Sequence, residues 1–231
     1  APDSWTPNIA TQATTGLLAD TPGAITAAAT VGSNIVAFKE RGAYLGQYQG
    51  APAVWGWIRI PGEGMGAYSH YSVADVEGVG LLFPGRDNFY LFDGNRATPI
   101  GSNRVAEAFF EDLDIALAPS MISFHDRKAW NVFWWYPSVS GGGTLDKFLV
   151  YNYRADKWGF GRKTVDFAYE HLEPGASYDG LGTNYSTWDS LPASSYDTTF
   201  ASSGTFKPAV VNPDNKVYKL EGSANPSNYT T

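Results

Sequence analysis

The sequence predicts an all-β protein, a β-propeller-like array of antiparallel hairpins with one short surface helix. Five stretches repeat one local pattern, in which a short apolar run leads through a tight polar turn into an aromatic-bearing return run. They span residues 35–45, 81–92, 121–133, 148–158 and 209–220. β-Branched and aromatic residues on both sides of Asp, Asn and Gly are typical of β-hairpins. A single hairpin cannot bury its apolar face, so several must pack around a shared core.

The spacing of these hairpins favours a propeller. Phe38 and Phe83 lie 45 residues apart, and Phe83 and Phe124 lie 41 apart, which is close to the period of about 40–50 residues in propeller blades. The next two intervals, to Tyr151 and then to Val211, are 27 and 60 residues. They indicate either that two hairpins share one blade or that loops are inserted. A β-sandwich built from the same hairpins is the alternative.

Composition agrees with a compact β protein. Of the 231 residues, 15% are aromatic and only 17% are charged, and there are 25 glycines and 14 prolines. Such a chain can bury a sizeable core and needs many turns. We expect residues 1–30 to form an extended arm or an incomplete first blade and residues 31–231 to form the propeller-like domain. The chain begins at Ala1 without an initiator Met, so we interpret it as a processed product or as a piece of a longer polypeptide.

The pattern of residues 53–60 predicts a strand with side chains on both faces that can make contacts. Trp55 and Trp57 alternate with smaller residues and so point to the same face. A flexible glycine-containing loop follows at residues 62–66.

One helix is predicted among the strands, at residues 102–113. Val105, Phe109 and Leu113 recur there at helical spacing, with Phe110 beside them. Residue preferences at helix ends predict that Ser102 or Asn103 caps the start of the helix and that Pro119 prevents a longer helix. The helix either covers the β body or docks a neighbouring subunit.

Residues 172–206 are polar, and we interpret them as a long connection between strands. Aromatic–Asp pairs at positions 178/179, 188/189 and 196/197 predict a series of local turns. Two other interpretations stay open. Residues 177–179 resemble the Asp-box turn of sialidase propellers, and four aromatic residues could form a carbohydrate platform: Tyr178, Tyr185, Trp188 and Tyr196.

Charge and composition argue against several function classes. The chain has 16 basic and 23 acidic residues, a net charge of −7 and no basic run. Tight binding of nucleic acid through its phosphates is therefore disfavoured. The absence of cysteine removes disulfides and thiolate metal sites. No apolar segment reaches the roughly 20 residues that a membrane-spanning helix needs, and no signal-peptide pattern opens the chain. We therefore expect a soluble protein without membrane insertion.

The sequence carries no recognisable catalytic motif. Paired carboxylates occur at Glu111, Asp112 and Asp114, and we expect them to form the solvated face of the helix. No catalytic, cofactor-binding or metal-binding residue is predicted, and the protein is not expected to be an enzyme.

A set of short motifs occurs in a characteristic order. They are residues 36–44, residues 90–94 with 99–101 and the helix through Phe109 and Phe110, residues 134–137, residues 150–153 ahead of Lys157 and Trp158, and residues 187–192. Together they resemble the tail-hub and nozzle proteins of tailed bacteriophages. These include the head-to-tail connectors of short-tailed phages, also called packaged-DNA stabilisation proteins. The similarity spans roughly residues 31–220.

The resemblance implies a virion structural protein of the tail, made in the host cytoplasm. Its subunits would form a homo-oligomeric ring, commonly six-fold, which continues the DNA channel below the portal and helps to retain or release the genome. Other tail or portal-adaptor proteins would be its partners, and genomic DNA would only pass through. The chain is shorter than these proteins, which leaves ring size and propeller closure open.

Five aromatic residues are the interface candidates under this interpretation: Trp55, Trp57, Phe109, Phe110 and Trp188. We expect Trp55, Trp57 or Phe109 to be partly exposed in the isolated subunit. Two rival functions remain. A receptor- or glycan-binding propeller predicts an aromatic cleft that includes Trp188, and a glycosidase propeller predicts two acidic side chains at the central axis.

Overall fold

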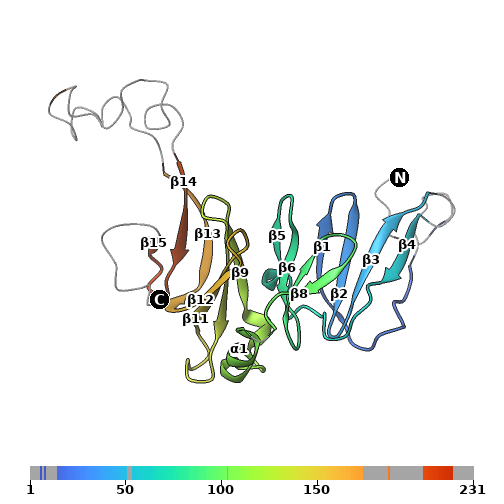
Figure 1. Ribbon diagram of the computed structural model, residues 1–231, viewed down its shortest axis with the longest axis horizontal. Coiled ribbons are helices and arrows are strands. Elements are labelled where there is room, and N and C mark those ends of the chain that lie inside the picture. Colours follow the sequence, from blue (N-terminus) through green and yellow to red (C-terminus); the bar gives the residue numbers. More distant parts are fainter. Residues whose placement is uncertain are drawn as a thin grey trace. The chain divides into compact units, whose positions relative to one another are not determined.

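The computed structural model describes residues 15–50, 54–102, 104–173 and 205–220, together with Thr6, Asn8 and Thr187. The fold is all-β, with four antiparallel sheets and one short α-helix (Figure 1). It divides into two compact units, one ending at Thr164 and the other formed by Val165–Tyr229. The single domain expected for residues 31–231 therefore consists of two units.

The first unit contains three sheets, each a four-stranded meander in which consecutive strands pair. Sheet 1 consists of β1 (Ile25–Val31), β2 (Asn34–Lys39), β3 (Ala43–Tyr48) and β4 (Trp55–Arg59). Sheet 2 consists of β5 (Ala74–Val76), β6 (Gly80–Pro84), β7 (Phe89–Phe92) and β8 (Ala97–Pro99). Sheet 3 consists of β9 (Ile122–Asp126), β10 (Asn131–Pro137), β11 (Leu145–Asn152) and β12 (Lys157–Val165).

The second unit contains a sheet of three antiparallel strands. They are β13 (Phe167–Glu173), β14 (Thr205–Val211) and β15 (Val217–Lys219), paired in chain order. Ala209 and Val210 are buried, whereas the three residues of β15 are exposed. The described residues of this unit therefore repeat the meander connectivity with three strands.

All five predicted hairpins are confirmed. They correspond to the pairs β2–β3, β6–β7, β9–β10, β11–β12 and β14–β15. The third and fourth hairpins share sheet 3, which explains the short interval of 27 residues. A clearer period appears when the first strands are compared: the sheets begin at Ile25, Ala74, Ile122 and Phe167, at intervals of 49, 48 and 45 residues.

The first strands of the three sheets in the first unit are neighbours, because β5 contacts both β1 and β9. This is how successive blades meet in a propeller. Closed propellers contain about four to eight blades, so three sheets do not close a ring by themselves. The meander array is thus part of the described fold, and propeller closure stays a prediction.

Sheet 2 is buried on both faces. Leu81 and Phe83 pack toward sheet 1, where the ring centroids of Phe83 and Phe38 are 4.7 Å apart. Leu82 and Phe89 point the other way, into a core shared with sheet 3 and the helix. Burying each such side chain stabilises the fold by about 1.5–3 kcal/mol. The two faces of sheet 2 thereby pack against sheet 1 and sheet 3.

The expected boundary at residue 30 lies inside β1. Residues 25–31 pair with β2, from Ile25 opposite Lys39 to Val31 opposite Asn34. The Ala- and Thr-rich composition of this strand hides it, since few of its side chains contribute to the core. Sheet 1 therefore includes the last part of the segment expected to be an arm.

The helix α1 (Ala106–Asp112) is shorter than predicted, and it has no side-chain cap. The carbonyl of Gly101 accepts the backbone N–H groups of Arg104, Val105 and Ala106. The Ser102 hydroxyl instead accepts a hydrogen bond from the Asn88 side chain, and Asn103 is outside the described residues. A backbone acceptor thus does what a capping side chain usually does.

The helix ends well before Pro119, because the chain returns to extended structure at Leu113. Leu113 forms a β-bridge with Ser138, and the N–H of Asp114 donates to the carbonyl of Pro137 at 2.9 Å. Two short 3₁₀ helices complete the first unit, η1 (His70–Ser72) and η2 (Ala118–Ser120). Pairing with sheet 3, and not the proline, ends the helix.

Candidate functional site

Trp55 and Trp57 lie on β4, the last strand of sheet 1, and are 37% and 41% exposed. Both point to the same face, as their spacing predicts. The Trp57 ring lies over Gly46 of β3, where a Cβ atom would come within 2.8 Å of it. The Tyr48 and Trp55 rings meet edge to face at 5.9 Å. We call Tyr48, Trp55 and Trp57 the edge surface.

Of the three residues for which partial exposure was expected in one or another, the two tryptophans of the edge surface are exposed, whereas Phe109 is 0% exposed and is not available as an interface residue. Its ring packs edge to face against Phe89 and Tyr136, with centroids 4.8 and 4.7 Å apart. Phe110 is half-buried against the same core, and Trp188 lies outside the described residues. The apolar stripe of the helix faces the core, which supports the interpretation that α1 covers the β body.

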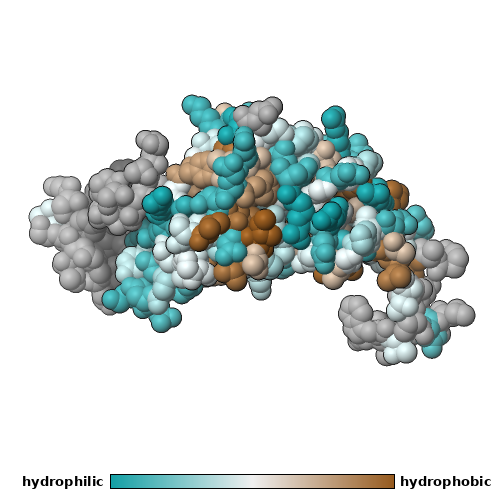
Figure 2. Space-filling view, turned by 90° about the horizontal axis from the view of Figure 1, so that it is seen from below, coloured by the Kyte–Doolittle hydropathy of each residue, from teal (hydrophilic) through white to brown (hydrophobic). Residues whose placement is uncertain are grey.

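A second exposed apolar surface follows the helix. Ile115 and Leu117 come shortly after it and are exposed. Val139 is also exposed and lies next to the last helix residue, since its N–H donates to the carbonyl of Asp112 at 2.8 Å. Figure 2 shows the protein from below, with brown apolar side chains exposed among the hydrophilic ones. We call Ile115, Leu117 and Val139 the helix-end surface. The sequence did not single it out, since its residues come from two loops.

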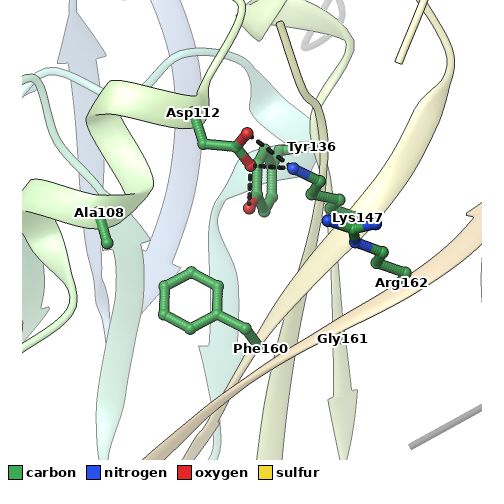
Figure 3. A pocket seen from close by; sticks show the side chains of 7 residues that line it. All are labelled: Ala108, Asp112, Tyr136, Lys147, Phe160, Gly161 and Arg162. Carbon is green, nitrogen blue, oxygen red and sulfur yellow. Dashed lines mark hydrogen bonds and ion pairs between the residues drawn. The ribbon is translucent and has the colours of Figure 1, made fainter. Parts of the chain in front are cut away.

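A pocket of about 280 Å³ opens between α1 and sheet 3 (Figure 3). The helix contributes Ala108 and Asp112, β10 and β11 contribute Tyr136 and Lys147, and β12 contributes the rest of the wall. The lining residues are Ala108, Asp112, Tyr136, Lys147, Phe160, Gly161 and Arg162.

Asp112 is the centre of the polar contacts in this pocket. Lys147 Nζ donates to Asp112 Oδ1 at 2.7 Å and to Oδ2 at 2.9 Å, and the Tyr136 hydroxyl donates to Oδ2 at 2.9 Å. Of the three carboxylates expected on a solvated helix face, Glu111 is exposed, whereas Asp112 is half-buried and paired and Asp114 lies past the end of the helix. A carboxylate at a helix C-terminus opposes the helix dipole, and the Lys147 ammonium offsets this.

Burial and the hydrogen bond to Asp112 raise the pKa of Tyr136 well above its usual value, while the charge of Arg162 acts in the opposite direction. Tyr136 is therefore protonated at neutral pH and acts as a donor. Sequence reasoning missed Tyr136, Lys147 and Arg162 because they are far apart in the chain. The only local signal is the strand alternation that places alternate residues on one face.

Within the described ranges no group of His, Cys, Asp or Glu side chains is arranged to hold a metal ion. The proposed carbohydrate platform and the residues resembling an Asp-box lie in a segment that the structure does not describe. In the described part of the chain, no helix has the length and apolar character to cross a membrane.

No protein-family model matches this chain, and no curated protein shows significant similarity to it.

Proposed function

We propose that this protein is a structural subunit of a phage tail hub, nozzle or head-to-tail connector. In this role it assembles side by side with further copies into a ring around the DNA path, and it helps to retain or release the genome. Other tail or portal-adaptor proteins would bind the ring, which would be part of the virion.

The observation that carries this proposal is a pair of separate exposed apolar surfaces on one unit. The edge surface belongs to sheet 1, and the helix-end surface lies beside α1 and sheet 3. A cyclic ring of more than two copies needs heterologous contacts, in which one patch meets a different patch on the next copy. Two distinct apolar patches on the same unit fit that requirement.

Charge gives independent support. The net charge of −7 and the lack of a basic run suit a conduit through which DNA moves without being held, because phosphate neutralisation supplies most non-specific affinity.

The test is the native mass of the protein as a function of concentration. We expect the wild-type chain to form a ring, six-fold if the resemblance holds, and the double variant Trp55→Ser, Trp57→Ser to shift toward monomer. Trp130→Ser is the matched control, because Trp130 is similarly exposed but belongs to neither surface. A chain that stays monomeric at high concentration, and binds glycans through Trp55 and Trp57, would replace this proposal with the glycan-binding one.

A further inference from the structure

The pocket beneath α1 contains more hydrogen-bond donors than acceptors. Lys147 uses two of its three ammonium N–H groups on Asp112. Arg162 carries five guanidinium N–H donors, and none of them is hydrogen-bonded or ion-paired to another described residue. Both cations line the same cavity, and Asp112 is the one carboxylate in its lining.

Positive charge also exceeds negative charge within the pocket lining. Asp112 balances one of the two cations. Asp146 is close enough to affect Tyr136, but it does not line the pocket, and its oxygens accept from the N–H and hydroxyl of Ser138 at 2.9 and 2.7 Å. Two like charges that face one cavity repel each other, and an anion placed between them lowers the energy.

The rest of the cavity is apolar and small. Phe160 is 40% exposed and forms one wall, with Ala108 opposite (Figure 3). A volume of about 280 Å³ lies below the usual range of about 300–1,000 Å³ for drug-sized ligands. It has room for a small molecule or for the end of one side chain.

We propose that this pocket binds a single carboxylate group carried on a small apolar body. The planar guanidinium of Arg162 holds the carboxylate, the remaining N–H of Lys147 donates to it, and Phe160 packs against the apolar body. Arginine suits this role because its fork of donors matches the two carboxylate oxygens. The carboxylate belongs either to a free small acid or to an acidic side chain of a second copy. The proposal does not depend on ring formation.

The experiment is a calorimetric titration of the folded chain with benzoate, with benzamide as the uncharged comparison. We expect benzoate to bind and benzamide not to bind. Arg162→Gln should weaken benzoate binding about ten-fold or more, because hydrogen bonds to charged groups contribute at least that factor. Phe160→Ala should weaken benzoate more than acetate.

Arg127→Gln is the matched control, since it removes the same charge from an exposed position in the turn after β9. Its benzoate affinity should equal that of the wild type. Absence of benzoate binding at about 10 mM, or equal weakening in both arginine variants, would overturn the proposal.

Sedimentation with and without benzoate separates the two sources of the carboxylate. If benzoate lowers the mass of an assembly, an acidic side chain of a second copy occupies the pocket. If the mass does not change while benzoate binds, the ligand is a free acid.

Discussion

Two strands of this protein carry paired tryptophans, and the pairs have opposite environments. Trp134 and Trp135 on β10 are fully buried, whereas Trp55 and Trp57 on β4 are partly exposed. β10 pairs with β9 and β11, so both of its sides are occupied, while β4 is the last strand of sheet 1. These two strands show that the same residue type builds a core or a surface according to what packs against the faces of its sheet.

The largest expected difference is in stability, between a variant that truncates a buried tryptophan and one that truncates an exposed tryptophan. Trp134→Ala removes a ring that packs 5.1 Å from Phe89 and donates from Nε1 to the carbonyl of Ser72 at 3.1 Å. We expect a loss of about 3–5 kcal/mol in the free energy of unfolding. Trp57→Ala should cost less than about 1 kcal/mol, as most surface substitutions do. Urea unfolding of both variants measures the difference, and equal losses would contradict the comparison.

A second test adds a methyl group under an aromatic ring in each environment. At Gly161 a new Cβ would lie 2.2 Å from the buried Phe148 ring, and at Gly46 it would lie 2.8 Å from the exposed Trp57 ring. Gly161→Ala should therefore cost about 1–3 kcal/mol, because a packed ring cannot move away. Gly46→Ala should cost clearly less, since Trp57 can swing toward solvent. Thermal unfolding of the two variants is the measurement, and a larger loss at Gly46 would be inconsistent with this account.

A buried and an exposed environment also distinguish two carboxylates of the helix, Asp112 and Glu111. Asp112→Ala leaves Lys147 and Tyr136 without their acceptor, so we expect a loss of about 1–2 kcal/mol, toward the lower end of the cost of an unsatisfied partly buried polar group. Glu111→Ala, at an exposed position of the same helix turn, should change stability by less than about 0.5 kcal/mol. Chemical denaturation compares them. Equal effects would mean that Asp112 contributes no more than a surface charge.

The last test is the response to alkaline pH. Burial, then the hydrogen bond and charge of Asp156, raise the pKa of Tyr151 from 10.0 to about 12. The folded state therefore holds this proton more tightly than the unfolded state does. The resulting stabilisation is complete below about pH 10 and is lost as the pH rises toward 12. We expect Tyr151→Phe to reduce the fall in urea midpoint between these values. An identical pH profile for the wild type and the variant would remove Tyr151 as a cause.

The sequence predicted the hairpins well because their information is local. Apolar runs on both sides of Asp-, Asn- and Gly-containing turns determine pairing between neighbours, and all five hairpins form. The strand through Trp55 and Trp57 was also predicted, together with their shared face. β1 was missed because alanines and threonines give a weak strand signal.

The interface candidates were predictable only in part. Exposure of Trp55 and Trp57 agrees with the expectation, but helical periodicity alone could not say whether Phe109 faces a core or a partner. The helix start was also misjudged, because the backbone carbonyl of Gly101 caps it and no sequence preference reports that contact.

Local chemistry thus specified the strands, their turns and the all-β class, since each depends on residues a few positions apart. Only the tertiary structure decided that sheet 2 is buried on both faces, that no described strand pairs with the outer edge of β4, and that Asp112, Tyr136, Lys147 and Arg162 meet in one pocket. The physical reason is that burial and electrostatic pairing depend on which surfaces pack together. Those surfaces come from segments tens of residues apart, whose contacts leave no periodic mark in the chain.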